Sequence, residues 1–100
     1  MSFEHVVTDI IKIFPEDEES FAGEFNTVDE FMERLSHRTT EILEENWFDI
    51  TSEDDDITEL RHVLKNLALR VSKAWWDTHE CFRWIDICRS NIRTLFLENN

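Results

Sequence analysis

The sequence predicts an all-α protein, a single domain over residues 1–100 whose helices form a small four-helix bundle. Apolar residues recur three and four positions apart along almost the whole chain, which is the spacing of an amphipathic helix. Residues that form turns are scarce, because the chain has one Gly and one Pro. Apolar residues make up 41% of the chain and include eight Phe and four Trp, so the composition favours a packed core over disorder.

The first helix is predicted over residues 3–14. Ser2 is a residue type that caps helices, and Pro15 stands where the helix would have to stop. The next segment, residues 15–26, contains four consecutive acids and the one Gly, and we expect it to be a loop, with a new helix begun by those acids after Pro15 as the alternative. The apolar stripe of this first helix is Phe3, Val6, Val7, Ile10, Ile11 and Phe14.

The second helix is predicted over residues 28–47, and its start is well marked. The sequence TVDE is a capping box, in which the Thr27 side chain accepts from the amide of Glu30 while Glu30 reaches back to the amide of Thr27. We expect Trp47 and Phe48 to close its end. Its apolar stripe is Val28, Phe31, Met32, Leu35, Ile42 and Leu43.

The rest of the chain has a helical pattern in which one break must be found. A single helix over residues 53–97 would be about 66 Å long, several times the radius of gyration of a domain of this size. The sequence WWDTHE offers a break, since Asp77 or Thr78 can cap a new helix and Glu80 would be the third residue of a capping box begun by Asp77. We therefore predict helices over residues 53–76 and 79–97, with one continuous helix as the alternative.

Charge is distributed unevenly along the chain. The formal net charge is −13, but residues 1–59 carry nineteen Asp or Glu against three Lys or Arg, whereas residues 60–100 carry four against seven. An acidic surface repels DNA, RNA and anionic membranes. The expected partner is therefore a basic protein, with no direct binding of nucleic acid or membrane.

The cysteines and the hydropathy pattern indicate a compartment. Cys81 and Cys88 are seven positions apart in a helical pattern, so their Cα atoms would lie about 10 Å apart, beyond the reach of a disulfide. Residues 1–30 lack the pattern of a signal peptide, and no apolar stretch would span a bilayer. We expect a reduced, cytoplasmic protein that is a monomer or a homodimer.

Acidic residues gather in three places: after the first helix, opposite the apolar stripe of the second, and at the start of the third. Thr51 or Ser52 is the expected N-cap of the third helix, and first-turn carboxylates stabilise a helix by about 0.3–1 kcal/mol each. Capping explains one or two acids of the third run, whereas like charges three or four positions apart cost a few tenths of a kcal/mol per pair. The three clusters therefore suggest a surface selected to meet a positive one. The candidate partner-binding acids are Glu16, Asp17, Glu18, Glu19, Glu30, Glu33, Glu41, Glu44, Glu45, Glu53, Asp54, Asp55 and Asp56.

Trp76 completes the candidate partner-binding set. Side chains of neighbouring residues leave a helix about 100° apart, so Trp75 and Trp76 cannot share one narrow stripe, and we expect one of them in the core. Trp76 falls on a row with Lys73 and Arg83, and an exposed Trp among cations is typical of an interface anchor. The alternative is that helix packing buries both tryptophans.

Metal binding and catalysis find little support in the sequence. Glu53–Asp56 lacks the alternating ligands and the Gly of a calcium loop, and Glu59-x-x-His62 is half of a di-iron pattern without its second copy. The cysteines and His79 are not spaced like structural zinc ligands. No phosphate-binding loop or nucleophile motif is present. We predict no enzymatic activity, no cofactor and no metal.

The Lys and Arg of the second half could form a nucleic-acid-binding face with Trp84, but we expect them to neutralise acids across the bundle. Two other functions remain. In charge and size the chain is similar to small acidic inhibitors, such as phage-encoded DNA mimics, anti-defence proteins and immunity or antitoxin-type proteins. This resemblance implies a protein that occupies a basic, nucleic-acid-binding surface of a partner. The alternative is a helical adaptor or structural subunit that oligomerises through an aromatic surface of residues 53–76 and 79–97.

Overall fold

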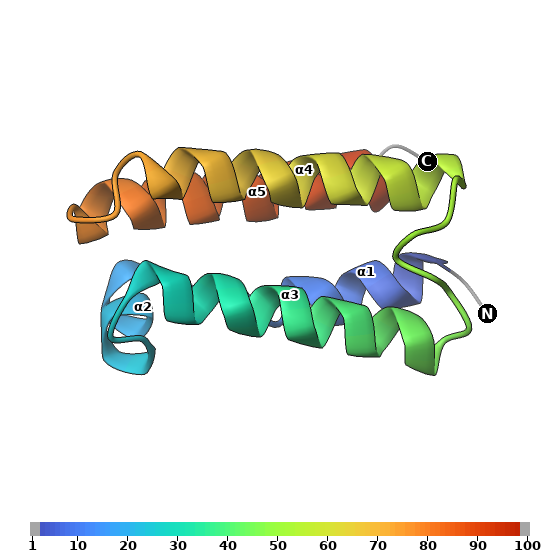
Figure 1. Cartoon of the computed structure of the whole chain (residues 1–100), viewed down its shortest axis with the longest axis horizontal. Coiled ribbons are helices and arrows are strands. Elements are labelled where there is room, and N and C mark those ends of the chain that lie inside the picture. Colours follow the sequence, from blue (N-terminus) through green and yellow to red (C-terminus); the bar gives the residue numbers. More distant parts are fainter. Residues whose placement is uncertain (1–2, 99–100) are drawn as a thin grey trace.

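A computed structural model describes residues 3–98, and all of the regular structure in this range is helical (Figure 1). Ser2, the expected cap of the first helix, lies outside the described residues. The all-α class is confirmed, but the described chain has five helices instead of the predicted four. They are α1 (Phe3–Ile11), α2 (Glu18–Glu24), α3 (Val28–Glu45), α4 (Asp55–Ser72) and α5 (Thr78–Phe96).

The helices lie in two layers, with α4 and α5 in one and α1, α2 and α3 in the other (Figure 1). α3 packs on α1, α1 on α5 and α5 on α4, while α2 packs on α5. Within residues 3–98 no packing of similar extent joins α3 to α4. The core between the layers consists of Val6, Val7, Ile10, Phe14, Phe21, Phe25, Val28, Phe31, Leu35, Ile42, Leu43, Ile57, Leu60, Leu67, Val71, Cys81, Ile85, Cys88 and Ile92.

The first helix is shorter than predicted, because α1 ends at Ile11 and not at residue 14. The amides of Ile13 and Phe14 donate to carbonyl oxygens only three residues back, at 3.0 and 3.1 Å, so the chain tightens out of the α-helix. Phe14 nevertheless remains in the core. Periodicity predicted the burial of Phe14 correctly and the end of the helix incorrectly.

The predicted loop over residues 15–26 is wrong, since it contains α2. Asp17 is the N-cap, and its side chain accepts from the amide of Ser20 at 2.7 Å. This hydrogen bond holds the pKa of Asp17 below its ordinary value. Gly23 lies inside the helix, and a Cβ there would meet nothing within 4 Å, so neither conformation nor space requires a glycine. Gly23 therefore marks no turn.

The start of α3 confirms the capping box in part. The Thr27 hydroxyl accepts from the amide of Glu30 at 3.2 Å, as predicted. The Glu30 carboxylate accepts from the amide of Asn26 at 3.3 Å instead of from that of Thr27. The helix ends at Glu45, two residues before the predicted end.

The predicted break in the C-terminal half is confirmed and is wider than expected. α4 ends at Ser72 instead of residue 76, and α5 begins at Thr78. The Asp77 side chain accepts from the amide of Glu80 at 3.0 Å, so Asp77, one of the two predicted caps, is the N-cap, and Thr78 is not. The chain thus reverses direction through residues 73–77, and both neighbouring tryptophans lie in that turn.

α4 begins with a different cap from the one predicted. Asp54 is the N-cap and accepts from the amide of Asp56 at 3.0 Å. Thr51 instead bonds to the Asp49 carboxylate through its amide and its hydroxyl, both at 2.8 Å, and these bonds lower the pKa of Asp49. The Ser52 hydroxyl accepts from the amide of Asp54 at 3.1 Å. Asp54 is therefore the acid of the run 53–56 that caps the helix.

Two further findings concern the interior. Thr39 of α3 is 1% exposed, and within the described residues its hydroxyl has no hydrogen-bond partner, so the buried stripe of α3 contains a polar position that the sequence pattern missed. Both cysteines are free and buried, and burial raises the pKa of the Cys88 thiol to about 12.

No helix between residues 3 and 98 has the length and apolar character to cross a membrane.

Candidate interaction surface

The predicted acidic residues lie at separate places along the molecule. α2 and the first acidic run are at one end of the long axis, and the start of α4 is at the other, along a molecule that extends 38 Å (Figure 1). α3 connects the two ends, and its acids point away from its buried stripe. The acids therefore form a band along α3 that reaches both ends, and not one compact patch.

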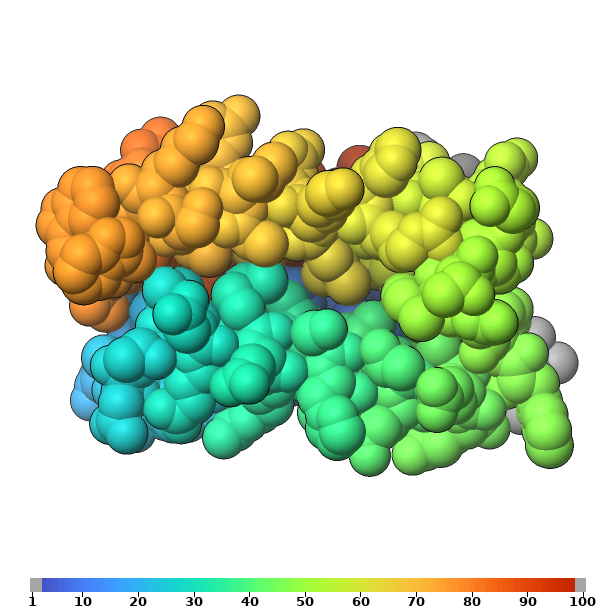
Figure 2. Space-filling model, viewed as in Figure 1, coloured from blue at the N-terminus to red at the C-terminus, as the bar shows by residue number. Residues whose placement is uncertain are grey.

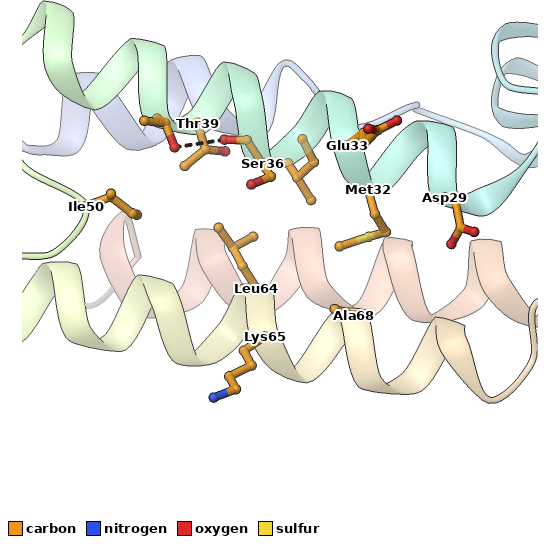
Figure 3. A pocket seen from close by; sticks show the side chains of 11 residues that line it. Asp29, Met32, Glu33, Ser36, Thr39, Ile50, Leu64, Lys65 and Ala68 are labelled. Atoms are coloured by element: carbon orange, nitrogen blue, oxygen red, sulfur yellow. Dashed lines mark hydrogen bonds between the residues drawn. The ribbon is translucent and has the colours of Figure 1, made fainter.

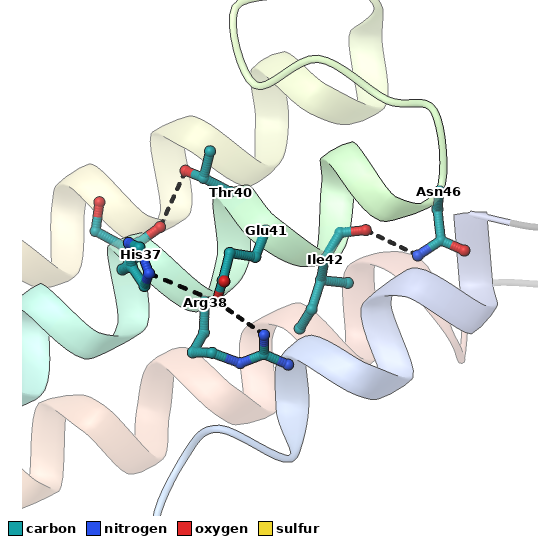
Figure 4. A network of polar contacts seen from close by, with 7 residues as sticks. His37, Arg38, Thr40, Glu41, Ile42 and Asn46 are labelled. Carbon is teal, nitrogen blue, oxygen red and sulfur yellow. Dashed lines mark hydrogen bonds and ion pairs between the residues drawn. The ribbon is translucent and has the colours of Figure 1, made fainter.

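Glu41 on α3 already has basic neighbours within the protein (Figure 4). Arg38 donates to the Glu41 carboxylate at 2.9 Å, and the Nε2 atom of His37 lies 3.6 Å from the same oxygen. The bond from Arg38 holds the pKa of Glu41 below its ordinary value, and it raises the pKa of Arg38. Glu41 is therefore the acid of this helix that is least available to a partner.

The remaining candidate acids divide into two groups. Asp17, Glu18, Glu30 and Asp54 are engaged by caps or by a histidine. In a second group the carboxylates make no hydrogen bond or ion pair within residues 3–98, and this group includes Asp29, which was not among the predicted residues. We call this group the unpaired carboxylates: Glu16, Glu19, Asp29, Glu33, Glu44, Glu53, Asp55 and Asp56. Glu45 stands between the groups, because its charge contributes to the raised pKa of Arg38.

Three arginines of the second half have partners other than those expected. Arg83 and Arg89 pair with Glu80 and Asp86 of their own helix, at 3.7 and 2.6 Å. Arg61 donates to two backbone carbonyl oxygens of the loop between α3 and α4, at 2.6 and 2.8 Å. Within residues 3–98, none of these three arginines forms an ion pair with an acid of the first half, although the charge of Arg61 helps to lower the pKa of Asp49.

Trp75 and Trp76 form an exposed aromatic pair at the turn between α4 and α5. They are 67% and 68% exposed, and their ring centroids lie 5.8 Å apart at nearly a right angle. The expectation that one of them is in the core is wrong, because α4 ends before it can carry either onto its buried face. Trp75 also lines a small hollow with Phe25 and Val28, so the pair stands beside the junction of α2 and α3.

His79 ties this end of the molecule to the first acidic run. Its Nδ1 atom lies 2.5 Å from a carboxylate oxygen of Glu18, and this hydrogen bond raises the pKa of His79 above its ordinary value of 6.5. A raised pKa means that the folded state favours the protonated histidine. The stabilisation is fully present below about pH 6.5 and is lost as the pH rises through the raised pKa of the folded state.

We expect an NMR titration of His79 to show this raised pKa. Replacing Glu18 with Gln removes the charged acceptor, so the pKa of His79 should fall back toward 6.5. Glu19→Gln is the matched control, because Glu19 is a neighbouring unpaired carboxylate, and it should leave the His79 titration nearly unchanged. A pKa of His79 that did not respond to Glu18→Gln would show that the contact is not made in solution.

Trp47 is a further functional candidate, although the sequence predicted only that it closes the end of a helix. It follows α3 with a φ of 66°, in the left-handed region that favours glycine. The amides of Trp47 and Phe48 donate to the carbonyl oxygens of Glu44 and Leu43, at 3.1 and 2.8 Å, which is the Schellman arrangement. The side chain is 91% exposed, so packing does not explain a tryptophan in a strained position beside Glu44.

Replacing Trp47 with Gly is expected to increase the free energy of unfolding. A left-handed non-glycine residue costs about 1–2 kcal/mol, and the extra freedom of Gly in the unfolded chain removes part of that gain. The net increase should be about 0.5–1 kcal/mol in urea denaturation. Trp47→Ala keeps the strain and is the control, which should show no such gain. Equal effects of Gly and Ala would contradict the left-handed conformation.

The described residues suggest no metal centre, since no group of three or more His, Cys, Asp or Glu within residues 3–98 is arranged to hold an ion. No protein-family model, curated protein or solved structure matches this chain. The function is therefore argued from the surface itself: a band of unpaired carboxylates with three exposed tryptophans at its ends.

Proposed function

We propose that this protein binds a basic partner protein through its band of unpaired carboxylates and thereby occupies the surface that the partner uses for nucleic acid. The observation that supports this most is that, within residues 3–98, none of those carboxylates forms an ion pair, although the chain has ten Lys and Arg. Like charges held together on a surface destabilise the fold, and a positive partner surface relieves that repulsion. A surface that needed only solubility would interleave both signs.

The exposed tryptophans give this electrostatic surface defined contact points. Trp47 lies beside Glu44, and Trp76 lies near the end that carries Glu19. Aromatic residues that lie in the centre of an interface contribute much of its binding energy, whereas charges at its edge mainly direct association. The carboxylates would therefore attract and orient a basic surface, and the tryptophans would hold it.

The test is a pull-down from the source cell with residues 1–100, at about 50 mM and about 500 mM NaCl, followed by competition with DNA or RNA. The proposal predicts a basic partner that is recovered at low salt, is lost at high salt and is released by nucleic acid. A partner that stays bound at high salt, or that binds nucleic acid and this protein together, would refute it.

The aromatic pair also favours a second candidate function, an adaptor or structural subunit that oligomerises through an aromatic surface at the turn between α4 and α5. Two tryptophans, each about two-thirds exposed, are unusual on an isolated surface. In this case Trp76→Ala should abolish assembly in analytical ultracentrifugation, while neutralising carboxylates of α3 should have little effect.

Two finer assignments are also proposals. We infer a four-helix bundle made of α1, α3, α4 and α5, because α3 packs on α1, α1 on α5 and α5 on α4 around one core, with α2 beside α5. We also infer a reducing, cytoplasmic environment, which is consistent with two buried free cysteines.

A further inference from the structure

The side of the molecule between α3 and α4 is open. Three pairings, α3 with α1, α1 with α5 and α5 with α4, close the other sides of the helix assembly. Between α3 and α4 lies a groove of about 530 Å³, and Figure 2 shows the surface hollowed along this line. The groove is a place where a further element could pack against the core.

The lining of the groove is mainly apolar. Met32 and Leu35 come from α3, Leu64 and Ala68 from α4, and Ile50 from the connecting loop. Figure 3 shows Met32 and Leu64 pointing into the space between the two helices, whereas Lys65 points away from it. Ala68 leaves room for close approach to the backbone of α4, and Met adapts to partners of different shape. Such a lining suits the apolar face of a helix.

The dimensions of the groove match a short helix. The α3 residues along its edge follow a spacing of three and four, from Asp29 through Met32, Glu33 and Ser36 to Thr40. This strip is about 16 Å long at 1.5 Å per residue, which corresponds to about three turns, or 11 residues, of a docked helix. A helix of that length presents three apolar anchors, at i, i+4 and i+7.

The charges at the edges select the occupant. On the α3 edge, Asp29 and Glu33 are unpaired carboxylates, and the one lysine lining the groove, Lys65, is on α4. An occupant with Lys or Arg along one flank of its apolar stripe would therefore orient that flank toward α3. We propose that the groove binds an amphipathic helix of the partner, with three apolar anchors and a basic flank facing α3. This proposal rests on the proposed function for the basic character of the partner.

A synthetic probe tests the groove without knowledge of the partner. The probe is a peptide of about 14 residues, held helical by a side-chain cross-link, with Leu at i, i+4 and i+7, Lys along one flank and Ala elsewhere. A second peptide has the same composition in shuffled order, so its charge is identical. Binding of both to the full chain is measured by fluorescence anisotropy, and the methyl signals of Met32, Leu64 and Ala68 are followed by NMR.

Two variants of the protein make the test specific. Ala68→Trp fills the groove from α4, and Glu33→Lys reverses the charge of its α3 edge while leaving the apolar lining intact. Both positions are outside the fully buried core, and circular dichroism verifies that each variant is folded. The wild-type protein should bind the patterned peptide roughly tenfold more tightly than the shuffled one, with shifts at Met32 and Leu64. Each variant should reduce that preference about tenfold.

Three outcomes would overturn the proposal. Equal, salt-sensitive binding of both peptides would leave the acidic surface of the proposed function in place and remove the groove from it. Binding of the patterned peptide without shifts at Met32 and Leu64 would place it elsewhere. A dimer of the protein that Ala68→Trp dissociates would show that a second copy of this chain, and not a partner helix, covers the groove.

Discussion

Replacing Phe31 with Ala is expected to lower the free energy of unfolding by about 3–5 kcal/mol, much of the stability of a domain of this size. Phe31 is fully buried on α3. Its ring lies 6.0 Å from that of Phe14, 5.8 Å from that of Phe21 and 5.2 Å from that of Phe25. One side chain thus connects α3 to α2 and to the turn after α1, so its removal leaves a cavity where three segments meet.

Urea denaturation followed by circular dichroism measures this loss, and amide hydrogen exchange locates it. The amides of α2 should lose protection first, because Phe21 is the residue of that helix buried in the core. Trp76→Ala removes an aromatic ring of larger size from a position 68% exposed, and it should change stability by no more than about 0.5 kcal/mol. A loss below about 1 kcal/mol for Phe31→Ala would contradict the aromatic cluster as described.

Neutralising Glu33 and Glu44 together is expected to weaken binding to the basic partner by about five- to thirtyfold. Each exposed ion pair contributes roughly 0.5–1 kcal/mol, and 1.4 kcal/mol corresponds to a factor of ten. Both side chains are exposed on α3 and are unpaired carboxylates, so Glu→Gln removes their charge without breaking a contact within the protein. The free energy of unfolding should stay the same or rise slightly, because repulsion along α3 decreases.

The matched control is the double variant Glu59→Gln and Glu98→Gln, which removes the same charge from exposed positions that are not on α3. Isothermal titration calorimetry with the captured partner should show less than about a threefold change for the control. If both double variants weaken binding equally, total charge governs the interaction and the band along α3 has no special role.

Local capping chemistry predicted the starts of two helices, although it failed for α4, which is capped by Asp54 and not by Thr51 or Ser52. Thr27 with Glu30 and Asp77 with Glu80 predicted the starts of α3 and α5, because a capping bond needs only neighbouring residues. α2 was predicted only as an alternative to a loop, because its acids and Gly23 are typical of loops. It forms because Asp17 caps it and because Phe21 and the following Phe25 are buried. That burial depends on contacts distant in sequence.

The candidate surface was predictable in its residues and not in its geometry. Composition showed that the first half is acidic, but only the structure shows that Glu41 is paired with Arg38 while Glu33 and Glu44 are not. The sequence has no recognisable pattern that predicts the left-handed backbone of Trp47, so this residue could not be identified as a candidate from the sequence. The groove between α3 and α4 depends on which helices pack together, and the spacing of apolar residues does not predict which helices those are.

The dissociation constant of the captured partner, measured by calorimetry across salt concentrations, tests the proposed electrostatic binding most directly. If the unpaired carboxylates bind a positive surface, the dissociation constant should rise by at least about tenfold between about 50 mM and about 500 mM NaCl. The Glu33→Gln and Glu44→Gln double variant should show a shallower dependence on salt than the wild type. A dissociation constant that stays the same over this range, or an equal dependence in both proteins, would contradict binding through this surface.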